Sequence, residues 1–296
     1  MTGSAVSLPV ALATAVASAA RGAGRCGLLL LGVLAIAPSD PAHAQGSLDA
    51  RYEATLAGIP VGKGVWRIDI GDDQYTASAS GGSSGLLKAF AGGDGTGASQ
   101  GRVVNSQLQP TNYSASTTTS RKSESIRMTL AGGAIKEFSI LPEPPVDADR
   151  IPVTEAHRRG VFDPMTGSLV RAAGAGDPLA ADSCRTTTAI FDGRMRYDLR
   201  LEFKRLDTVK AEKGYRGPAL VCAIYFSPIS GYIADRAAIK YLVAQRDMEV
   251  WLVPIAGTRI LVPFRLKIPT PLGNAVLEAT QFVTAATAPR AASKTQ

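Results

Sequence analysis

Histidine is scarce in this chain: His43 and His157 are the only two among 296 residues. Catalysis by a serine–histidine arrangement needs an imidazole base beside its nucleophile. His157 lies in the polar segment EAHRRG, which is typical of an exposed loop. The nearest match to a G-x-S-x-G elbow, Gly81 to Gly85, lies in a glycine-rich stretch and lacks the spacing. The sequence therefore offers no catalytic triad.

Long hydrophobic runs are also lacking. The apolar run CGLLLLGVLAIA, residues 26–37, is too short for a membrane-spanning helix, which takes about 20 residues. It follows Arg21 and Arg25 and precedes an A-x-A motif, residues 42–44. Residues 1–44 are therefore predicted to be a cleaved secretory signal peptide, which predicts a periplasmic protein. An uncleaved membrane anchor is the alternative.

Cysteine is limited to three residues, and Cys26 would leave with the signal peptide. Cys184 and Cys222 then remain in an oxidising compartment, which predicts a disulfide between them. In the chain-entropy model, a disulfide that closes a loop of this length stabilises the folded state by about 4 kcal/mol. Two buried free thiols are the alternative. With His157 as the sole remaining imidazole, we expect neither a metal nor a cofactor.

A formal charge of +7 favours anionic neighbours such as lipid headgroups or envelope polymers. Nucleic acid is not expected as a partner, because no Lys/Arg cluster with interleaved aromatic residues is present. The glycine-rich run Gly92–Gly97 lacks the Lys-Ser/Thr of a phosphate loop and is expected to be an ordinary loop.

Alternating apolar and polar residues predict strands along most of the mature chain. We expect an all-β, antiparallel, strongly curved or partly closed barrel-like sheet, as one domain over residues 45–284. A crossover over residues 143–182 should contain a helix near residues 162–173, with Asp163 as its cap and Pro164 at its first position. Residues 285–296 are predicted to be a disordered tail. The predicted strands cover residues 48–58, 64–70, 74–80, 102–110, 111–119, 125–140 (as two strands), 185–191, 195–203, 219–226, 246–254, 258–270 and 273–283.

The stretch IFDGRMRYDLRLEF, residues 190–203, has the clearest pattern. Asp192-Gly193 predicts a two-residue hairpin turn. The following strand has one apolar face, which we expect to meet a core or a ligand, and one charged face, which we expect at an outer surface or rim. The apolar face comprises Met195, Tyr197, Leu199, Leu201 and Phe203, with Trp66 and Trp251 as further candidates, and the charged set comprises Arg194, Arg196 and Arg200.

Acidic residues provide the alternative of a hydrolase. Asp192, Asp198 and Glu202 would have to converge in one pocket, with carboxylates about 5 to 10 Å apart. Turn formation by Asp192 and cross-strand charge pairing by the other two explain them more simply. Asp147 and Asp149 lie in a proline-rich loop without further metal ligands.

Three segments resemble exported bacterial proteins of the family called domain of unknown function 3108. They are RYEATLAGIPVGKGVWRI, AIFDGRMRYDLRLEF with VCAIYFSPISGY, and DMEVWLVPIAGTRILVPFRLKIPTPLGNAVLEA. The family is similar in architecture to lipoprotein-carrier-type proteins with a curved sheet. The resemblance implies an envelope location and carries over no catalytic residue. Residues 254–257 (PIAG) stand where the resemblance leads us to expect an acidic turn.

These observations favour a non-enzymatic periplasmic protein that supports the cell envelope. It would bind a lipid, a lipoprotein or another envelope component on its curved sheet. Two alternatives stay open: the hydrolase of envelope polysaccharide or peptide, and a structural module that binds a protein partner without a ligand cavity.

Overall fold

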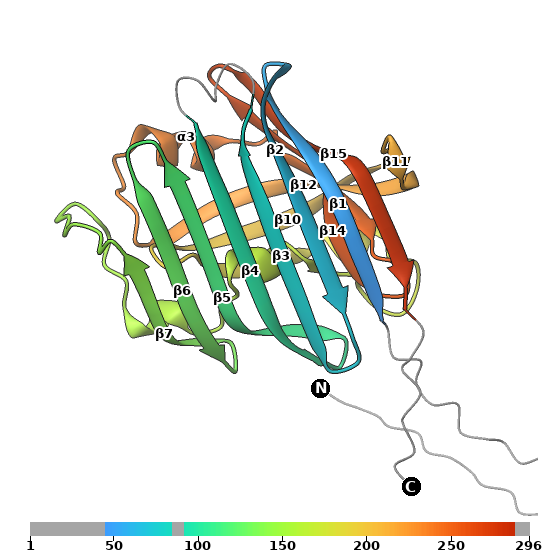
Figure 1. Cartoon of the computed structure of the whole chain (residues 1–296), viewed down its shortest axis with the longest axis horizontal. Helices are drawn as coiled ribbons and strands as arrows, with labels where there is room; N and C mark the ends of the chain where they lie inside the picture. The colour runs from blue at the N-terminus through green and yellow to red at the C-terminus, as the bar shows by residue number, and fades with distance from the viewer. Residues whose placement is uncertain (1–44, 85–91, 288–296) are drawn as a thin grey trace, which may run out of the picture. The chain divides into compact units, whose positions relative to one another are not determined.

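The strands form one 15-stranded sheet in the computed structural model, which describes residues 45–84 and 92–287. The order along the sheet is β7-β6-β5-β4-β3-β2-β1-β15-β14-β13-β12-β10-β9 (Figure 1). Neighbours on this path are antiparallel, which confirms the predicted all-β class. The strands are β1 (Gly46–Leu56), β2 (Ile59–Ile70), β3 (Gln74–Ser83), β4 (Gly93–Val104), β5 (Gln107–Thr119), β6 (Ser123–Ala131), β7 (Ala134–Leu141), β8 (Val170–Arg171), β9 (Thr186–Phe191), β10 (Arg196–Lys210), β11 (Lys213–Gly214), β12 (Arg216–Ser230), β13 (Glu249–Pro254), β14 (Ile260–Thr270) and β15 (Gly273–Ala286).

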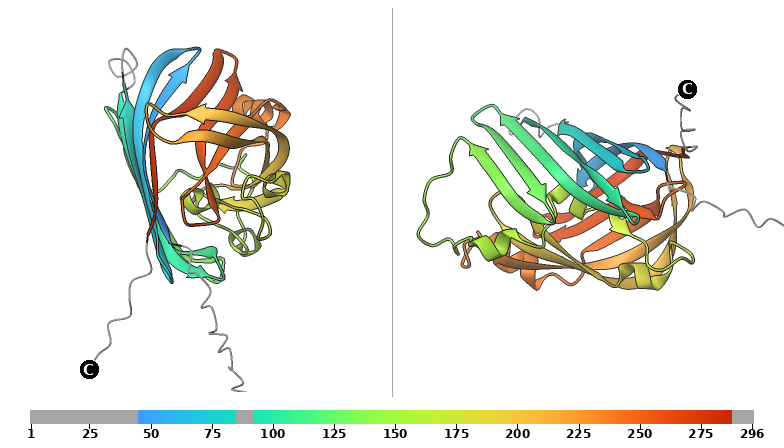
Figure 2. Two further views of the ribbon diagram at one scale, coloured as in Figure 1. Left: turned by 90° about the vertical axis from the view of Figure 1, so that its right-hand side faces the viewer. Right: turned by 90° about the horizontal axis from the view of Figure 1, so that it is seen from below.

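Period-two alternation gives the first half of the sheet a buried face, here called the inner face. On β1 it carries Leu48, Ala50 and Tyr52, all nearly inaccessible to solvent. Cross-strand pairs extend this face across the whole sheet, because residues directly opposite each other point to the same side. In Figure 2 the C-terminal strands turn to face the wall formed by β1 to β7.

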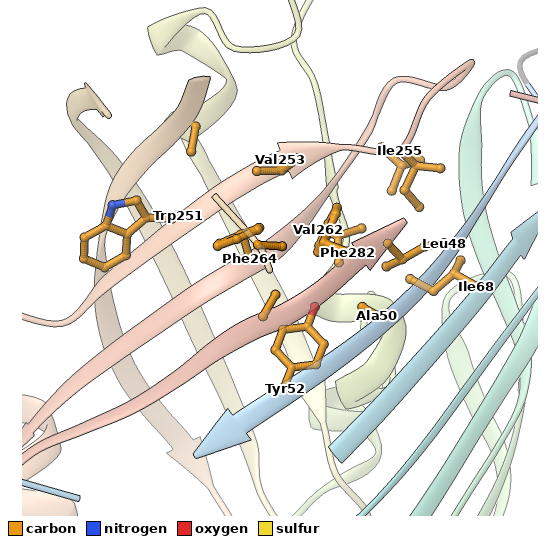
Figure 3. Packing of buried hydrophobic residues seen from close by; sticks show 14 of the residues in the cluster. Leu48, Ala50, Tyr52, Ile68, Trp251, Val253, Ile255, Val262, Phe264 and Phe282 are labelled. Atoms are coloured by element: carbon orange, nitrogen blue, oxygen red, sulfur yellow. The ribbon is translucent and has the colours of Figure 1, made fainter. Parts of the chain in front are cut away.

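Register shifts allow this change of direction. One lies in the β1–β15 ladder between Arg51 and Tyr52, and another in the β13–β14 ladder between Trp251 and Leu252. Bulges of this kind bend a strand and increase its twist. The end of the β13–β14 hairpin is consequently buried on both faces. Trp251 and Val253 pack in a first core with Leu48 (Figure 3), whereas alternate residues of β13 pack in a second core.

The crossover links the two ends of the sheet. Arg159 forms a backbone bridge with Ala134 of β7, and Phe162 forms one with Ile190 of β9. Among the described residues no ladder joins β7 directly to β9, so the sheet is only partly closed. The helical segments are η1 (Glu155–Arg158), α2 (Pro164–Gly167), η2 (Ala181–Cys184) and α3 (Ala237–Ala244). The predicted disulfide is present and joins Cys184 of η2 to Cys222 of β12.

Four expectations need correction or fall outside the described chain. Residues 93–97 are part of β4, because glycine can occupy a strand where its neighbours supply the ladder. The predicted helix is only α2, although Asp163 caps it and Pro164 begins it as expected. Residues 285 and 286 pair with β1 and do not belong to a disordered tail. The predicted signal segment, residues 1–44, and the end of the tail lie outside the described residues.

Candidate functional site

The inner face is incompletely covered along one row of residues. Trp66 pairs with Ala50 on one side and with Ala79 on the other, and the row continues through Gly97 to Ala115. Ala50 is fully buried, whereas Trp66, Ala79, Gly97 and Ala115 keep intermediate exposure. The sheet therefore has small residues on its inner side next to a half-buried indole ring.

The adjoining row contains glycines, which have no side chain to cover the inner face. A Cβ atom added to Gly95 would lie 3.4 Å from the Ser116 carbonyl oxygen and 3.6 Å from Thr117 Cγ2 of the adjacent strand, with no other described residue beyond its chain neighbours within 4 Å. At Gly64 it would likewise meet only β3. Among the described residues, no side chain from the C-terminal strands or the crossover thus contacts these two positions. We call Gly64, Ala79, Gly81, Gly95, Gly97 and Ala115 the small-residue floor.

Aromatic and aliphatic side chains on other strands belong to the same inner face. The rings of Tyr197 and Phe226 lie 5.5 Å apart, and Leu199 is directly opposite Phe226. Tyr197, Leu199 and Phe226 are half-buried, whereas Leu201 is buried. Burial raises the pKa of Tyr197, and the neighbouring charges of Asp192 and Tyr113 raise it further. Tyr113 of β5 therefore lies near Tyr197 of β10.

A buried polar network centred on Asp163 lies near these tyrosines. Asp163 is completely buried, and its carboxylate accepts hydrogen bonds from Thr166 Oγ1 (2.7 Å) and Ser99 Oγ (3.1 Å). The backbone nitrogens of Met165 and Thr166 also donate to it. Burial raises the pKa of Asp163 despite these bonds, which lower it. The network fixes α2 against β4, where Met165 meets Gly97.

The other face of β10 carries charge. Arg200 and Glu202 form an ion pair, and the guanidinium of Arg200 lies 4.2 Å from the centre of the Tyr225 ring. Further along, Lys204 and Arg205 bind Glu249, whose side chain is 5% exposed. Burial alone would raise the pKa of Glu249, but hydrogen bonds from Arg205, Lys204 and Lys267 lower it to about 2. The charged groups named here are thus engaged in ion pairs within the protein.

The remaining charged and aromatic candidates are engaged in structural contacts. Arg194 binds Glu124 of β6 at 2.6 Å, and Arg196 binds Asp198 at 2.6 Å. Trp251 is 4% exposed and donates its Nε1 hydrogen to Asp207 Oδ2 (2.9 Å), so it is a core residue. Trp66, by contrast, finds no acceptor for its buried Nε1 among the described residues.

Phe203 departs from its expected interior position, since it is 43% exposed. It lies opposite Cys222 of β12, but β9 pairs with β10 only as far as Leu201. Beyond that residue, no strand in the described part of the chain pairs with the second side of β10. Phe203 thus follows the predicted alternation but lies at an uncovered edge.

The structure does not bring the three candidate acids together. Asp192 accepts hydrogen bonds from the backbone nitrogens of Arg194 and Met195, which stabilise the hairpin turn. Asp198 and Glu202 are each bound to an arginine two residues away. Within the described residues no group of three or more His, Cys, Asp or Glu side chains could hold a metal ion.

Two parts of this lining were absent from the sequence-based prediction. Tyr113 was not singled out, because the pairing of distant strands decides which residues face it. The small-residue floor did leave a signal: Gly93, Gly95 and Gly97 alternate with polar residues, as one face of a strand would. In the described part of the chain, no helix is long and apolar enough to cross a membrane.

Together the fold and this lining define a class: antiparallel β proteins with a curved, partly closed sheet and a half-exposed apolar inner face. Within that class, the chain belongs to the family described as "Protein of unknown function (DUF3108)", whose model matches residues 51–280. The comparison with curated proteins gave no match.

One similar solved structure is a beta-barrel-like protein of domain of unknown function DUF1849 from Brucella abortus. The similarity covers 83% of this chain and 99% of that chain, with 8% sequence identity and a TM-score of 0.44.

Proposed function

We propose that this protein binds a lipid or a lipid-like envelope component against its inner face, without catalysing a reaction, in the periplasm. The observation that carries the proposal is the small-residue floor beside the half-buried Trp66, together with half-buried apolar residues elsewhere on the inner face, namely Tyr113, Tyr197, Leu199 and Phe226. Apolar groups left partly exposed on a concave protein face are typical of ligand sites.

Trp66 narrows the chemistry of the ligand. Its Nε1 is buried and has no hydrogen-bond acceptor among the described residues. Protein atoms cover this nitrogen, so the part of Trp66 that a ligand can reach is the apolar part of its half-exposed ring. The ligand we propose therefore has an acyl chain, which covers the floor and the Trp66 ring.

The two tryptophans allow a direct test, because Trp66 lies in the proposed site and Trp251 lies in the core. Dibromostearic acid should quench the tryptophan emission of the mature protein, since bromine quenches an indole that it contacts. A Trp66→Phe variant should lose the quenching, whereas Trp251→Phe should keep it. Quenching that follows Trp251, or no quenching at all, would refute binding at this face. Stearic acid without bromine is the control ligand.

A pair of variants separates loss of the site from loss of the fold. Gly95→Phe places a ring over the floor, and Thr96→Phe places the same ring on the opposite, exposed face of β4. Only Gly95→Phe should abolish quenching, with both proteins keeping their strand content by circular dichroism. Native mass spectrometry of gently purified protein would then identify a co-purifying lipid.

A further inference from the structure

Two neighbouring hairpin turns form one end of the sheet, here called the rim. One turn joins β1 to β2 through Ala57 and Gly58, and the other joins β14 to β15 through Pro271 and Leu272. The Ala57 nitrogen donates to the Asn274 carbonyl oxygen at 2.9 Å, so the turns are held together. Both project from the upper end of the sheet in Figure 1.

The rim exposes large apolar side chains. Leu272 is 75% exposed and Ile59 is 61% exposed, which are high values for leucine and isoleucine. Residues 54–62 and 268–277 contain no charged residue, although 19% of the chain is charged. An apolar and charge-free surface on two adjacent turns is better suited to an apolar partner than to water.

Charged pairs begin where the rim ends. Lys63 lies 3.9 Å from Glu53, and Arg265 lies 3.8 Å from Glu278. Glu53 is directly opposite both Lys63 and Glu278 in the ladders, so these ion pairs form one belt across β14, β15, β1 and β2. An apolar tip followed by a charged belt matches the boundary between acyl chains and headgroups in a bilayer.

We propose that the rim docks onto the surface of a lipid bilayer, with Ile59 and Leu272 in the interfacial layer and the charged belt at the headgroups. The Ala57 and Leu272 backbone nitrogens of the two turns already donate hydrogen bonds within the protein, which favours a non-directional apolar partner over a peptide strand. The rim also adjoins Leu277, which is 37% exposed and lies on the inner face opposite Ala54. Docking would thus bring the bilayer to the proposed ligand surface, and in this respect the inference extends the proposed function.

Vesicle flotation tests the proposal with mature protein and phosphatidylcholine vesicles, with and without added phosphatidylglycerol. Wild-type protein should float with both. The double variant Ile59→Asp/Leu272→Asp should bind at least about tenfold more weakly, because burying one such side chain is worth about that factor or more. Leu206→Asp is the matched control, since Leu206 is 58% exposed on β10, outside both turns, and it should float like wild type.

Other outcomes would overturn the proposal. These are the absence of flotation, equal loss in Leu206→Asp, or binding that needs phosphatidylglycerol and persists in the double variant. A concentration-dependent dimer of the wild type that the double variant cannot form would assign the rim to a second copy of the chain. Dibromostearate quenching of Trp66 in vesicle-free buffer reports the ligand site separately, so the two proposals can fail independently.

Discussion

Lys204 Nζ lies 2.6 Å from Glu249 Oε1, and the next residue, Arg205, binds the same oxygen at 3.0 Å. Consecutive residues of a regular strand point to opposite faces, so this arrangement requires an irregularity. The register of β10 against β12 shifts between Phe203 and Arg205, which leaves Lys204 as the extra residue of a bulge. Lys267 Nζ completes the set at 3.1 Å from Oε2. One nearly buried carboxylate thereby holds β10, β13 and β14 together.

Replacing Glu249 with glutamine should lower the free energy of unfolding by about 2 to 3 kcal/mol at pH 7, because three cations lose their shared partner. The pKa of Glu249 is about 2 in the folded protein, below the value of about 4.3 for an unfolded glutamate. Its stabilisation is therefore present above that unfolded value and is lost as the pH falls towards 2. Urea unfolding across this range should show the wild type and E249Q converging in acid.

Glu202→Gln, at an exposed ion pair, should change stability by less than about 0.5 kcal/mol. A constant difference between wild type and E249Q at all pH values would contradict this role.

Because the edge of β10 is uncovered beyond Leu201, two apolar positions on the same face should differ in how well they tolerate a charged substitution. Leu201→Asp should prevent stable folding, because Leu201 is 8% exposed and a charge there would be buried without a partner. Phe203→Asp should lower the melting temperature only slightly, since Phe203 is 43% exposed. Thermal unfolding followed by circular dichroism measures both. Equal damage by the two substitutions would mean that Phe203 is covered in solution.

These two residues also show how far the sequence predicts the fold. Strict alternation from Met195 to Phe203 predicts the strand and its apolar face, and Asp192-Gly193 predicts the preceding turn. The alternation cannot predict that β9 stops pairing at Leu201, because the length of a neighbouring strand is not a local property. The bulge at Lys204 is equally hidden, since nothing in the residue types marks it.

The candidate site was predictable to a similar degree. Period-two patterns identified Trp66, Tyr197 and Leu199 as residues of an apolar face. The proximity of Tyr197 to Tyr113 depends on a sheet in which β1 pairs with β15 and the crossover joins β7 to β9. Such contacts between distant segments leave no periodic signal in one sequence.

The disulfide should stabilise the protein by restricting the unfolded chain. Cys184 and Cys222 are 38 residues apart, and a loop of that size corresponds to about 4 kcal/mol in the chain-entropy model. Reductant should lower the denaturant midpoint of the wild type by a corresponding amount. A Cys184→Ala/Cys222→Ala variant should have the lower midpoint from the start and should not respond to reductant. If reductant left the wild-type midpoint unchanged, the bond would be absent or without effect on stability.

Asp163 should make the protein less stable as the pH rises above about 4. Its carboxylate is completely buried and burial raises its pKa, so the folded state holds its proton to a higher pH than the unfolded state does. Stability from a group with a raised folded pKa is fully present below the unfolded value, about 3.9, and is lost as the pH rises through the folded value.

Asparagine cannot ionise and is an equally good helix cap. Asp163→Asn should therefore remove this decline in stability. Asp163→Ala should lower the free energy of unfolding by about 1 to 2 kcal/mol at every pH because the helix cap is lost. It should lower it further because Ser99 and Thr166 lose their hydrogen-bond acceptor. Guanidinium unfolding at a series of pH values gives the three stability curves. Parallel curves for wild type and Asp163→Asn would show that the buried carboxylate titrates alike in the folded and unfolded chain, and would leave the hydrogen bonds to Ser99 and Thr166 as its whole contribution.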